Sequence, residues 1–395
     1  MKKFSVWRFM PFWKRVPQSI YINLGGTFDK APKFDDGISI LWANSLYEIF
    51  YPIDMCCDRA CNVPFIKIND KGEELPYTPF QQAFMKRPNE LLTFTQFLYN
   101  YSFNLMASGN AFVHYLKTGD NISYANVLNS DFVMPNINKG DTIILSKAGN
   151  VKNYLYKNFT INKDDIYYSC YLPQTFDNDI KLGITPLKIV ERNINLLSAV
   201  YMARWNVYDN NGIAGIIAKK ASNENSFEMA LDPVTQKSIA DELLNEYKLT
   251  KHNNIKGISS IPLEFISTLA TIKDLEPFRE VMADAIAIAA VYGVKKELLG
   301  RETDTTFNNQ RDAERFLWQN TIKSVAIDMS EMLERLLGIK QGEHIIPDFS
   351  KIEILQDDEA TRIDTLMKKI EVYEKTGNLT GENYDNEIKN LAKYV

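Results

Sequence analysis

The sequence has few of the residues from which extracellular frameworks and membrane spans are built. Its 395 residues include only four cysteines, Cys56, Cys57, Cys61 and Cys170, which are unevenly spaced. This spacing argues against a disulfide framework, so we expect a reduced protein of the cytosol. No uninterrupted apolar run approaches the ~18 residues that a membrane-spanning helix needs, so we expect no membrane partner.

Patterns for catalysis and metal binding are missing as well. Cys57 and Cys61 are four residues apart and could form half of a zinc site, but His114, His252 and His344 are scattered singly. We interpret the cysteines as buried structural residues and His114 as a packed residue of a strand. The Walker phosphate-binding motif and the HExxH and GxSxG motifs are absent. The sequence therefore predicts no enzyme, no cofactor and no metal site.

The charge balance is slightly acidic. Lys and Arg number 45 against 50 Asp and Glu, which gives a formal net charge of -5. This balance excludes a protein that coats nucleic acid by bulk positive charge, because such binding needs many cations to neutralise phosphates. Any contact with DNA must then be local or transient. With 45% hydrophobic residues the chain can bury several cores, and its length indicates two or three domains.

The longest helical patterns flank a polar loop. Apolar residues recur at three- and four-residue steps between Phe278 and Tyr292, which predicts a helix that Gly293 ends. A second pattern begins behind Thr306 and continues to Gly338. At 1.5 Å per residue it makes a helix of roughly 50 Å. Such a helix is longer than one ordinary core requires, so we expect it to cross an assembly.

The rest of the chain mixes helix and strand patterns. Thr185 is placed to cap a helix, with Pro186 in its first turn. The mixture predicts an α+β fold, with a small domain inserted between two long helices. The expected helices cover 39–62, 93–108, 185–209, 235–247, 357–375 and 380–393, and the expected strands cover 63–68, 110–115, 213–218, 255–259 and 263–267, with short antiparallel strands from 116 to 172.

Several short stretches, taken in their order and spacing, resemble the HK97-like portal family of tailed bacteriophages. Each is weak alone, but together they extend over about residues 40 to 340. The stretches are CDRACNVP at 57–64, RPN at 87–89, LMASGNAF at 105–112, GITPL at 183–187, YGV at 292–294, LLG at 298–300 and TFNN at 306–309.

The resemblance implies a ring, typically a dodecamer, at one capsid vertex of the virion, assembled in the host cytoplasm. Double-stranded DNA would be packaged and ejected through its centre. The implied partners are further copies of this chain, the terminase large subunit, head-tail adaptor proteins, and the major capsid and scaffolding proteins. The implied parts are a wing (1–183 and 307–340), two stem helices (184–210 and 274–293), a clip (211–273), a tunnel loop (294–306) and a crown (341–395).

The resemblance also assigns two contact sites. Bases and acids of the tunnel loop nearly cancel, which suits a sliding contact, because a strongly basic collar would hold phosphates tightly. The clip would dock the terminase and then the adaptors. The DNA-facing residues would be Lys295, Lys296, Glu297, Arg301, Glu302, Asp304, Thr305 and Thr306, and the docking residues would be Lys219, Lys220, Lys248, Lys251 and Lys256.

The apolar pattern gives an independent reason to expect a closed ring. Both helices that flank the loop carry apolar residues outside a single stripe, namely Ile288, Val291, Trp318 and Leu337. A monomer would leave some of that surface exposed to solvent, whereas neighbouring subunits could cover it. We also expect the two stem helices to lie side by side. Two alternatives stay open, namely another phage ring or capsid protein without DNA translocation, and an enzyme that acts on nucleic acid.

Overall fold

A computed structural model describes most of the chain. The described residues are 31–118, 121–137, 151–172, 174–176, 179–209, 215–219, 263–267, 277–300, 307–356 and 366–372. The elements expected at 235–247, 255–259 and 380–393 lie outside them. The chain divides into two compact units, one made of Met1–Asp35 and Val190–Ile288, the other of Asp36–Ile189 and Ala289–Val395. Each unit is described by itself.

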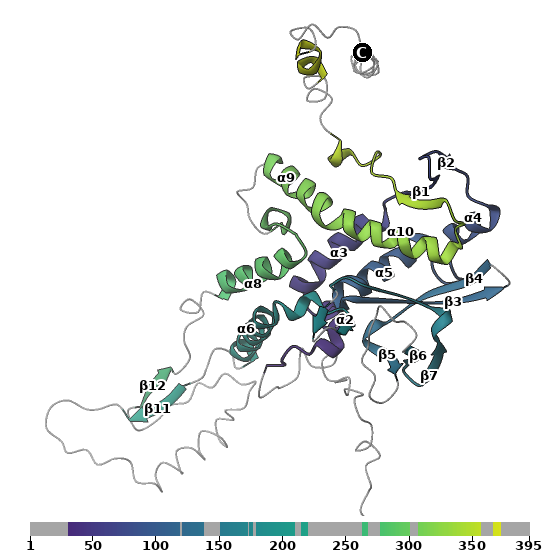
Figure 1. Ribbon diagram of the computed structural model, residues 1–395. Helices are drawn as coiled ribbons and strands as arrows, with labels where there is room; N and C mark the ends of the chain where they lie inside the picture. Colours follow the sequence, from purple (N-terminus) through teal and green to yellow (C-terminus); the bar gives the residue numbers. More distant parts are fainter. Residues whose placement is uncertain are drawn as a thin grey trace, which may run out of the picture. The chain divides into compact units, whose positions relative to one another are not determined.

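Helices form the centre of the larger unit, where α3 and α5 pack against each other (Figure 1). The single helix expected at 39–62 is broken, because Leu46 adopts an extended conformation between two helices. The helix expected at 93–108 is confirmed: Thr93 caps it through a capping box and Gly109, with φ +76°, ends it. The bounds are α2 Ser39–Ser45, α3 Tyr47–Cys61, α4 Pro79–Lys86 and α5 Phe94–Ser108.

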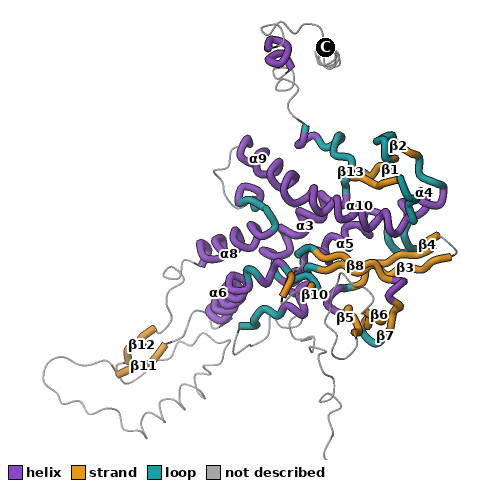
Figure 2. Tube along the Cα trace, in the orientation of Figure 1, coloured by secondary structure: helices purple, strands orange, loops and turns teal. Residues whose placement is uncertain are grey.

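Antiparallel strands lie beside these helices, as expected for residues 116 to 172 (Figure 2). The sheet orders are β13-β1-β2, β4-β3-β8, β5-β6-β7 and β10-β9. The strands are β1 Phe65–Asn69, β2 Glu74–Leu75, β3 Asn110–Thr118, β4 Asn121–Leu128, β5 Val133–Ile137, β6 Val151–Tyr156, β7 Phe159–Asn162, β8 Ile166–Cys170, β9 Gln174–Phe176, β10 Asp179–Lys181 and β13 Glu343–Pro347.

Strand β13 corrects the sequence analysis, which expected no strand after Gly338. It pairs antiparallel with β1, so that Ile345 lies opposite Lys67 and is 2% exposed. Glu343 also forms an ion pair with the buried Lys67 at 3.3 Å. Residues 343–347 therefore complete a sheet begun near the N-terminal end of the described chain.

Two of the short motifs meet at the junction between α5 and β3. A Cβ atom at Gly109 would overlap the backbone carbonyl of Ile184, so only glycine fits there. Thr185 Oγ1 donates to the Ala107 carbonyl at 2.6 Å and accepts from the Leu187 N–H at 3.2 Å. The motifs at 105–112 and 183–187 are thus packed backbone against backbone.

The cap at Thr185 is as expected, but the helix behind it is not continuous. A short 3-10 helix, η6 (Pro186–Lys188), follows the cap, and α6 begins only at Glu191 (Glu191–Asp209). In the smaller unit, Asn193 Nδ2 of α6 donates to Asp284 Oδ1 of α8 (Pro277–Val291) at 2.9 Å. Strand β11 (Gly215–Lys219) pairs antiparallel with β12 (Leu263–Ser267), close to two of the expected strands.

The long helix behind the polar loop is confirmed from Phe307 to Leu337, but one turn of it is irregular. It consists of α9 (Phe307–Leu317), a π-helical turn η8 (Trp318–Ile322) and α10 (Lys323–Leu337), and Gly338 ends it with φ +57°. α10 packs on α3, α5 and β13. Among the described residues, no helix has both the length and the apolar character needed to cross a bilayer.

The apolar residues that were expected to need neighbouring subunits for cover are mostly buried within one chain, so this expectation was wrong. Ile288, Trp318 and Leu337 are 0%, 7% and 6% exposed, and Val291 is half-buried, so a single chain already covers most of this surface. Periodicity alone could not show this, because contacts with distant elements widen the buried face of a helix. The exposed apolar side chains of the long helix are others, Phe307, Phe316 and Ile327, at 78%, 40% and 46%.

Candidate functional site

The described part of the polar loop leaves α8 at Gly293, which has φ +74°, and forms one short 3-10 helix, η7 (Lys296–Leu298). Lys295 and Lys296 are exposed and Glu297 is half-buried. The structure therefore brings three of the expected DNA-facing residues into one turn. The other five, Arg301, Glu302, Asp304, Thr305 and Thr306, lie outside the described residues.

Lys295 lies against the long helix. Its Nζ is 4.2 Å from the ring centroid of Phe316 in α9, a cation–π contact. At an exposed site such a contact is worth about 0.5–1 kcal/mol. Phe316 could not be predicted as a partner of Lys295, because the two residues are far apart in the chain and no local pattern links them.

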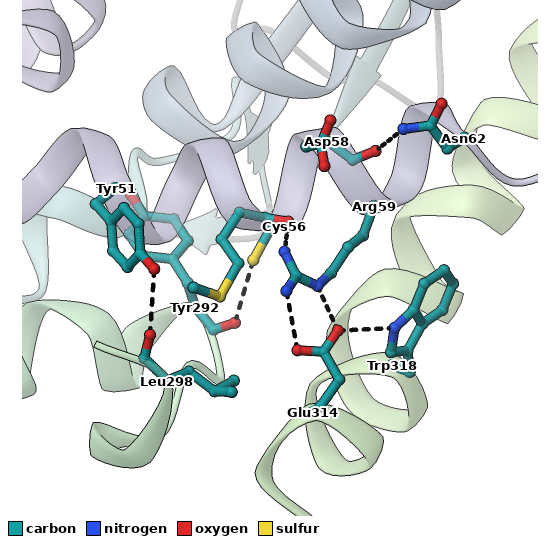
Figure 3. A network of polar contacts seen from close by, with 10 residues as sticks. Tyr51, Cys56, Asp58, Arg59, Asn62, Tyr292, Leu298, Glu314 and Trp318 are labelled. Atoms are coloured by element: carbon teal, nitrogen blue, oxygen red, sulfur yellow. Dashed lines mark hydrogen bonds and ion pairs between the residues drawn. The ribbon is translucent and has the colours of Figure 1, made fainter. Parts of the chain in front are cut away.

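Helix α3 contacts both the start of the loop and α9, the helix behind it (Figure 3). Tyr51 Oη donates to the Leu298 carbonyl at 3.3 Å, on the side where the loop begins. On the side where it ends, Arg59 binds the Glu314 carboxylate through two hydrogen bonds of 2.5 and 2.9 Å. Trp318 Nε1 donates to the same carboxylate at 3.1 Å. One helix thus holds the start of the loop and the helix that follows it.

Glu314 offsets the effect of burial on Arg59. Burial lowers the pKa of the Arg59 guanidinium, but the hydrogen bonds and charge of Glu314 outweigh it, so the pKa is raised above its ordinary value. The pair is bidentate, which fixes orientation as well as distance. The pair therefore fixes the position and orientation of α9 on α3.

A pocket of about 720 Å³ lies between α3, η7 and α9. Its walls are mixed: the Arg59–Glu314 pair, Glu297, Arg311 and Glu353 contribute charge, and aromatic and aliphatic side chains contribute apolar surface. They include Tyr51, Met55, Leu298, Phe307 and Trp318. Within the described ranges, no three or more His, Cys, Asp or Glu residues are grouped so that they could hold a metal ion.

The cysteines have the structural role that was expected. Cys56, Cys57 and Cys61 are buried free thiols, and Cys170 is half-buried. Burial raises the pKa of Cys56 to about 12 and of Cys61 to about 11, so both stay protonated at neutral pH. A protonated thiol is a poor metal ligand, which fits the structural interpretation.

His114 is half-buried on β3, as expected for a packed residue. Burial lowers the pKa of its imidazole, and the nearby charge of Asp165 only partly opposes this. Of the expected docking residues, Lys219 is the last residue of β11. The remaining four, Lys220, Lys248, Lys251 and Lys256, lie outside the described residues.

Comparison with known proteins gives a family and a fold. The family model described as phage portal protein matches residues 49–380. No curated protein matches. Several solved structures do, at low sequence identity, so they bear on the fold alone.

A structure of the neck of an empty gene transfer agent particle, computed with C6 symmetry, is 17% identical with a TM-score of 0.59. The match covers 88% of this chain and 93% of the chain in the neck structure. The neck of the native particle, computed with C12 symmetry, is 18% identical over 87% and 91% of the two chains, with a TM-score of 0.57. An HK97 family phage portal protein from Corynebacterium diphtheriae is 12% identical, with a TM-score of 0.53. The match covers 84% of this chain and 100% of the portal protein chain.

Proposed function

Because this chain belongs to the phage portal protein family, a family of structural and non-enzymatic virion proteins, we propose that it forms a ring at one capsid vertex through which double-stranded DNA passes. The number we propose is twelve copies. One of the similar neck structures was computed with C12 symmetry, which supports this number. DNA would enter through this ring during packaging and leave through it during ejection.

The observation that carries the proposal is the fastening of the polar loop on α3. The start of the loop is held on α3 by the Tyr51–Leu298 hydrogen bond, and α9, the helix behind the loop, is held on the same helix by the Arg59–Glu314 pair. A loop whose flanking segments are held on one rigid element can present its middle part to a moving ligand without deforming the core. This is what a channel-lining loop requires.

We propose the following parts, which extend the element order of the chain. The wing comprises 1–183 and 307–340, with β13 added because it pairs with β1. The stem helices are 184–210 and 274–293, the clip is 211–273, the tunnel loop is 294–306, and the crown follows Pro347. The hydrogen bond between Asn193 and Asp284 supports neighbouring stem helices.

For the loop we propose a sliding contact with DNA. In the described turn, the exposed Lys295 and Lys296 are followed directly by the half-buried Glu297, so an anion lies beside the two cations. The contact of Lys295 with Phe316 draws that ammonium toward α9. Weak, nearly balanced charge lets a duplex move, because no phosphate is held for long. Arg301, Glu302, Asp304, Thr305 and Thr306 belong to the same proposed surface.

For the clip we propose docking of the terminase large subunit during packaging and of head-tail adaptor proteins afterwards. Its lysines, Lys219, Lys220, Lys248, Lys251 and Lys256, would supply charge for transient contacts that are made and released. Contacts with the major capsid and scaffolding proteins would hold the ring at its vertex. All of these partners are inferred from the family.

Electron microscopy of the purified protein tests the ring directly, and images of an axial ring with a central channel are the expected result. Packaging tests the loop. Replacing Lys295, Lys296 and Arg301 by alanine should leave the ring intact and change the length of packaged DNA, because the remaining acids would repel the duplex.

The control for packaging replaces Lys368 and Lys369, exposed lysines of a helical segment at 366–372. Normal genome length in the triple variant, or an equal change in the control, would contradict the proposed DNA contact. A protein that remains monomeric while folded would contradict the ring.

A further inference from the structure

The π-helical turn in the long helix has a signature in the sequence. In η8 the Lys323 N–H donates to the Trp318 carbonyl, five residues back. Around it, the buried residues Ala313, Leu317 and Thr321 recur at four-residue steps and continue with Val325 and Met329. In an α-helix, four residues advance about 40° beyond a full turn. With each four-residue step, the stripe of buried residues would therefore rotate further away from the core. A π turn takes up the extra residue and keeps the stripe buried.

The same turn brings one polar side chain to the end of α8. Thr321 is 4% exposed, and its Oγ1 donates to the Tyr292 carbonyl at 2.9 Å. This carbonyl belongs to the end of a helix, where backbone oxygens lack partners of their own. It also faces the Cys56 Sγ at 3.8 Å, a much weaker donor (Figure 3). Thr321 is therefore its principal partner.

Tyr292 and Gly293 are fixed on the remaining sides as well. The Tyr292 ring is fully buried, and its hydroxyl donates to the Met106 carbonyl at 3.2 Å. Gly293 has φ +74°, and a Cβ atom there would lie 2.5 Å from Thr321 Oγ1. Next, the Val294 N–H donates to the Ala289 carbonyl at 3.1 Å. The backbone therefore turns out of α8 in direct contact with Thr321, and there is no space for a side chain at Gly293.

We propose that Thr321 is a positioning residue for the tunnel loop: its hydroxyl, delivered by the π turn, fixes the direction in which the chain leaves α8. The residue need not touch DNA, since it acts through the Tyr292 carbonyl and Gly293. The inference rests on the proposed function for the meaning of this position, because a loop that lines a channel needs a fixed direction. The contact itself is a property of the protein alone.

Hydrogen exchange in the full-length protein separates positioning from general stability. Thr321→Val keeps the branched shape but removes the hydroxyl, so the peptide 289–300 should exchange about fivefold faster, the factor that corresponds to about 1 kcal/mol for one hydrogen bond. Thr321→Ser restores the hydroxyl and should restore the slow exchange. Thr321→Ala serves as a second variant without the hydroxyl, should the valine not be accommodated.

Ser330 supplies a matched control on the same helix. It is 6% exposed, and its hydroxyl donates at 2.6 Å to the Ile327 carbonyl within α10, away from the loop. Ser330→Ala should leave the exchange of 289–300 unchanged. Wild-type exchange in the valine and alanine variants would overturn the inference. So would faster exchange that is equal in a reference peptide from α5, because it would mark a merely structural role.

Packaging then separates this inference from the proposed function. Fast exchange of 289–300 together with an altered length of packaged DNA supports both. Fast exchange with normal packaging supports Thr321 as the positioning residue and contradicts the role of the loop in the channel. Slow exchange in the variants contradicts the positioning role, whatever the packaging result.

Discussion

The Arg59–Glu314 pair offers a quantitative test of how α3 fastens the loop. Replacing Arg59 by Met and Glu314 by Gln keeps side-chain size and removes one charge at a time. The side chains are 26% and 21% exposed, so the pair lies between the surface and the interior. Exposed pairs contribute about 0.2–1 kcal/mol, whereas breaking a fully buried pair costs about 3–5 kcal/mol.

From this position we expect each single substitution to lower the free energy of unfolding by about 2 kcal/mol. Arg59→Met leaves the Glu314 carboxylate with the Trp318 Nε1 donor at 3.1 Å, which offsets part of the loss. The double variant should lose less than the sum, with a coupling energy of about 1–2 kcal/mol. Solvent screening of the exposed part keeps this value below that of a fully buried pair.

The assay is urea unfolding of all four proteins in the same assembly state, because oligomerisation itself shifts apparent stability. The control cycle uses Lys351 and Asp348, a pair at 3.6 Å whose lysine is 73% exposed, where we expect coupling below about 0.5 kcal/mol. A coupling energy for Arg59 and Glu314 no larger than in this control would refute the reasoning.

Three further predictions concern a glycine, a thiol and an aromatic ring. Gly109→Ala should cost more than about 3 kcal/mol, because strain at φ +76° adds to a backbone overlap, whereas Gly72→Ala, with φ +79° and open space, should cost only about 1–2 kcal/mol in thermal unfolding. Because burial raises the pKa of Cys56 from 9.0 to about 12, the folded protein keeps this proton between the two values while the unfolded chain loses it, so the free energy of unfolding falls by about 1.4 kcal/mol per pH unit as pH rises through this interval. Unfolding at pH 8 to 11 should therefore show a shallower decline in Cys56→Ala, and parallel curves would contradict this. Phe316→Leu should cost about 0.5–1 kcal/mol in denaturant unfolding, and the cost should vanish when Lys295 is Gln; an equal cost in both backgrounds would mean that only packing is lost.

The sequence determined the features that depend on short-range chemistry. Thr93 and Thr185 cap helices where hydroxyl side chains can satisfy free N–H groups, and Gly109, Gly293 and Gly338 end helices with positive φ. Helical periodicity placed the long helix. These signals lie within a few residues of the feature they specify, so they can be interpreted without knowing the fold.

The tertiary structure alone decided which distant segments meet. The pairing of β13 with β1, the Arg59–Glu314 pair and the contact of Lys295 with Phe316 join residues that no local pattern relates. The same holds for the buried surface. From the helical pattern, Trp318 was expected to lie outside the buried face, yet it is only 7% exposed. Its Nε1 donates to the Glu314 carboxylate, a contact that the helical pattern does not show. Periodicity states which face of a helix is apolar, but the width of the buried face depends on what packs against it, and that is a property of the assembled fold.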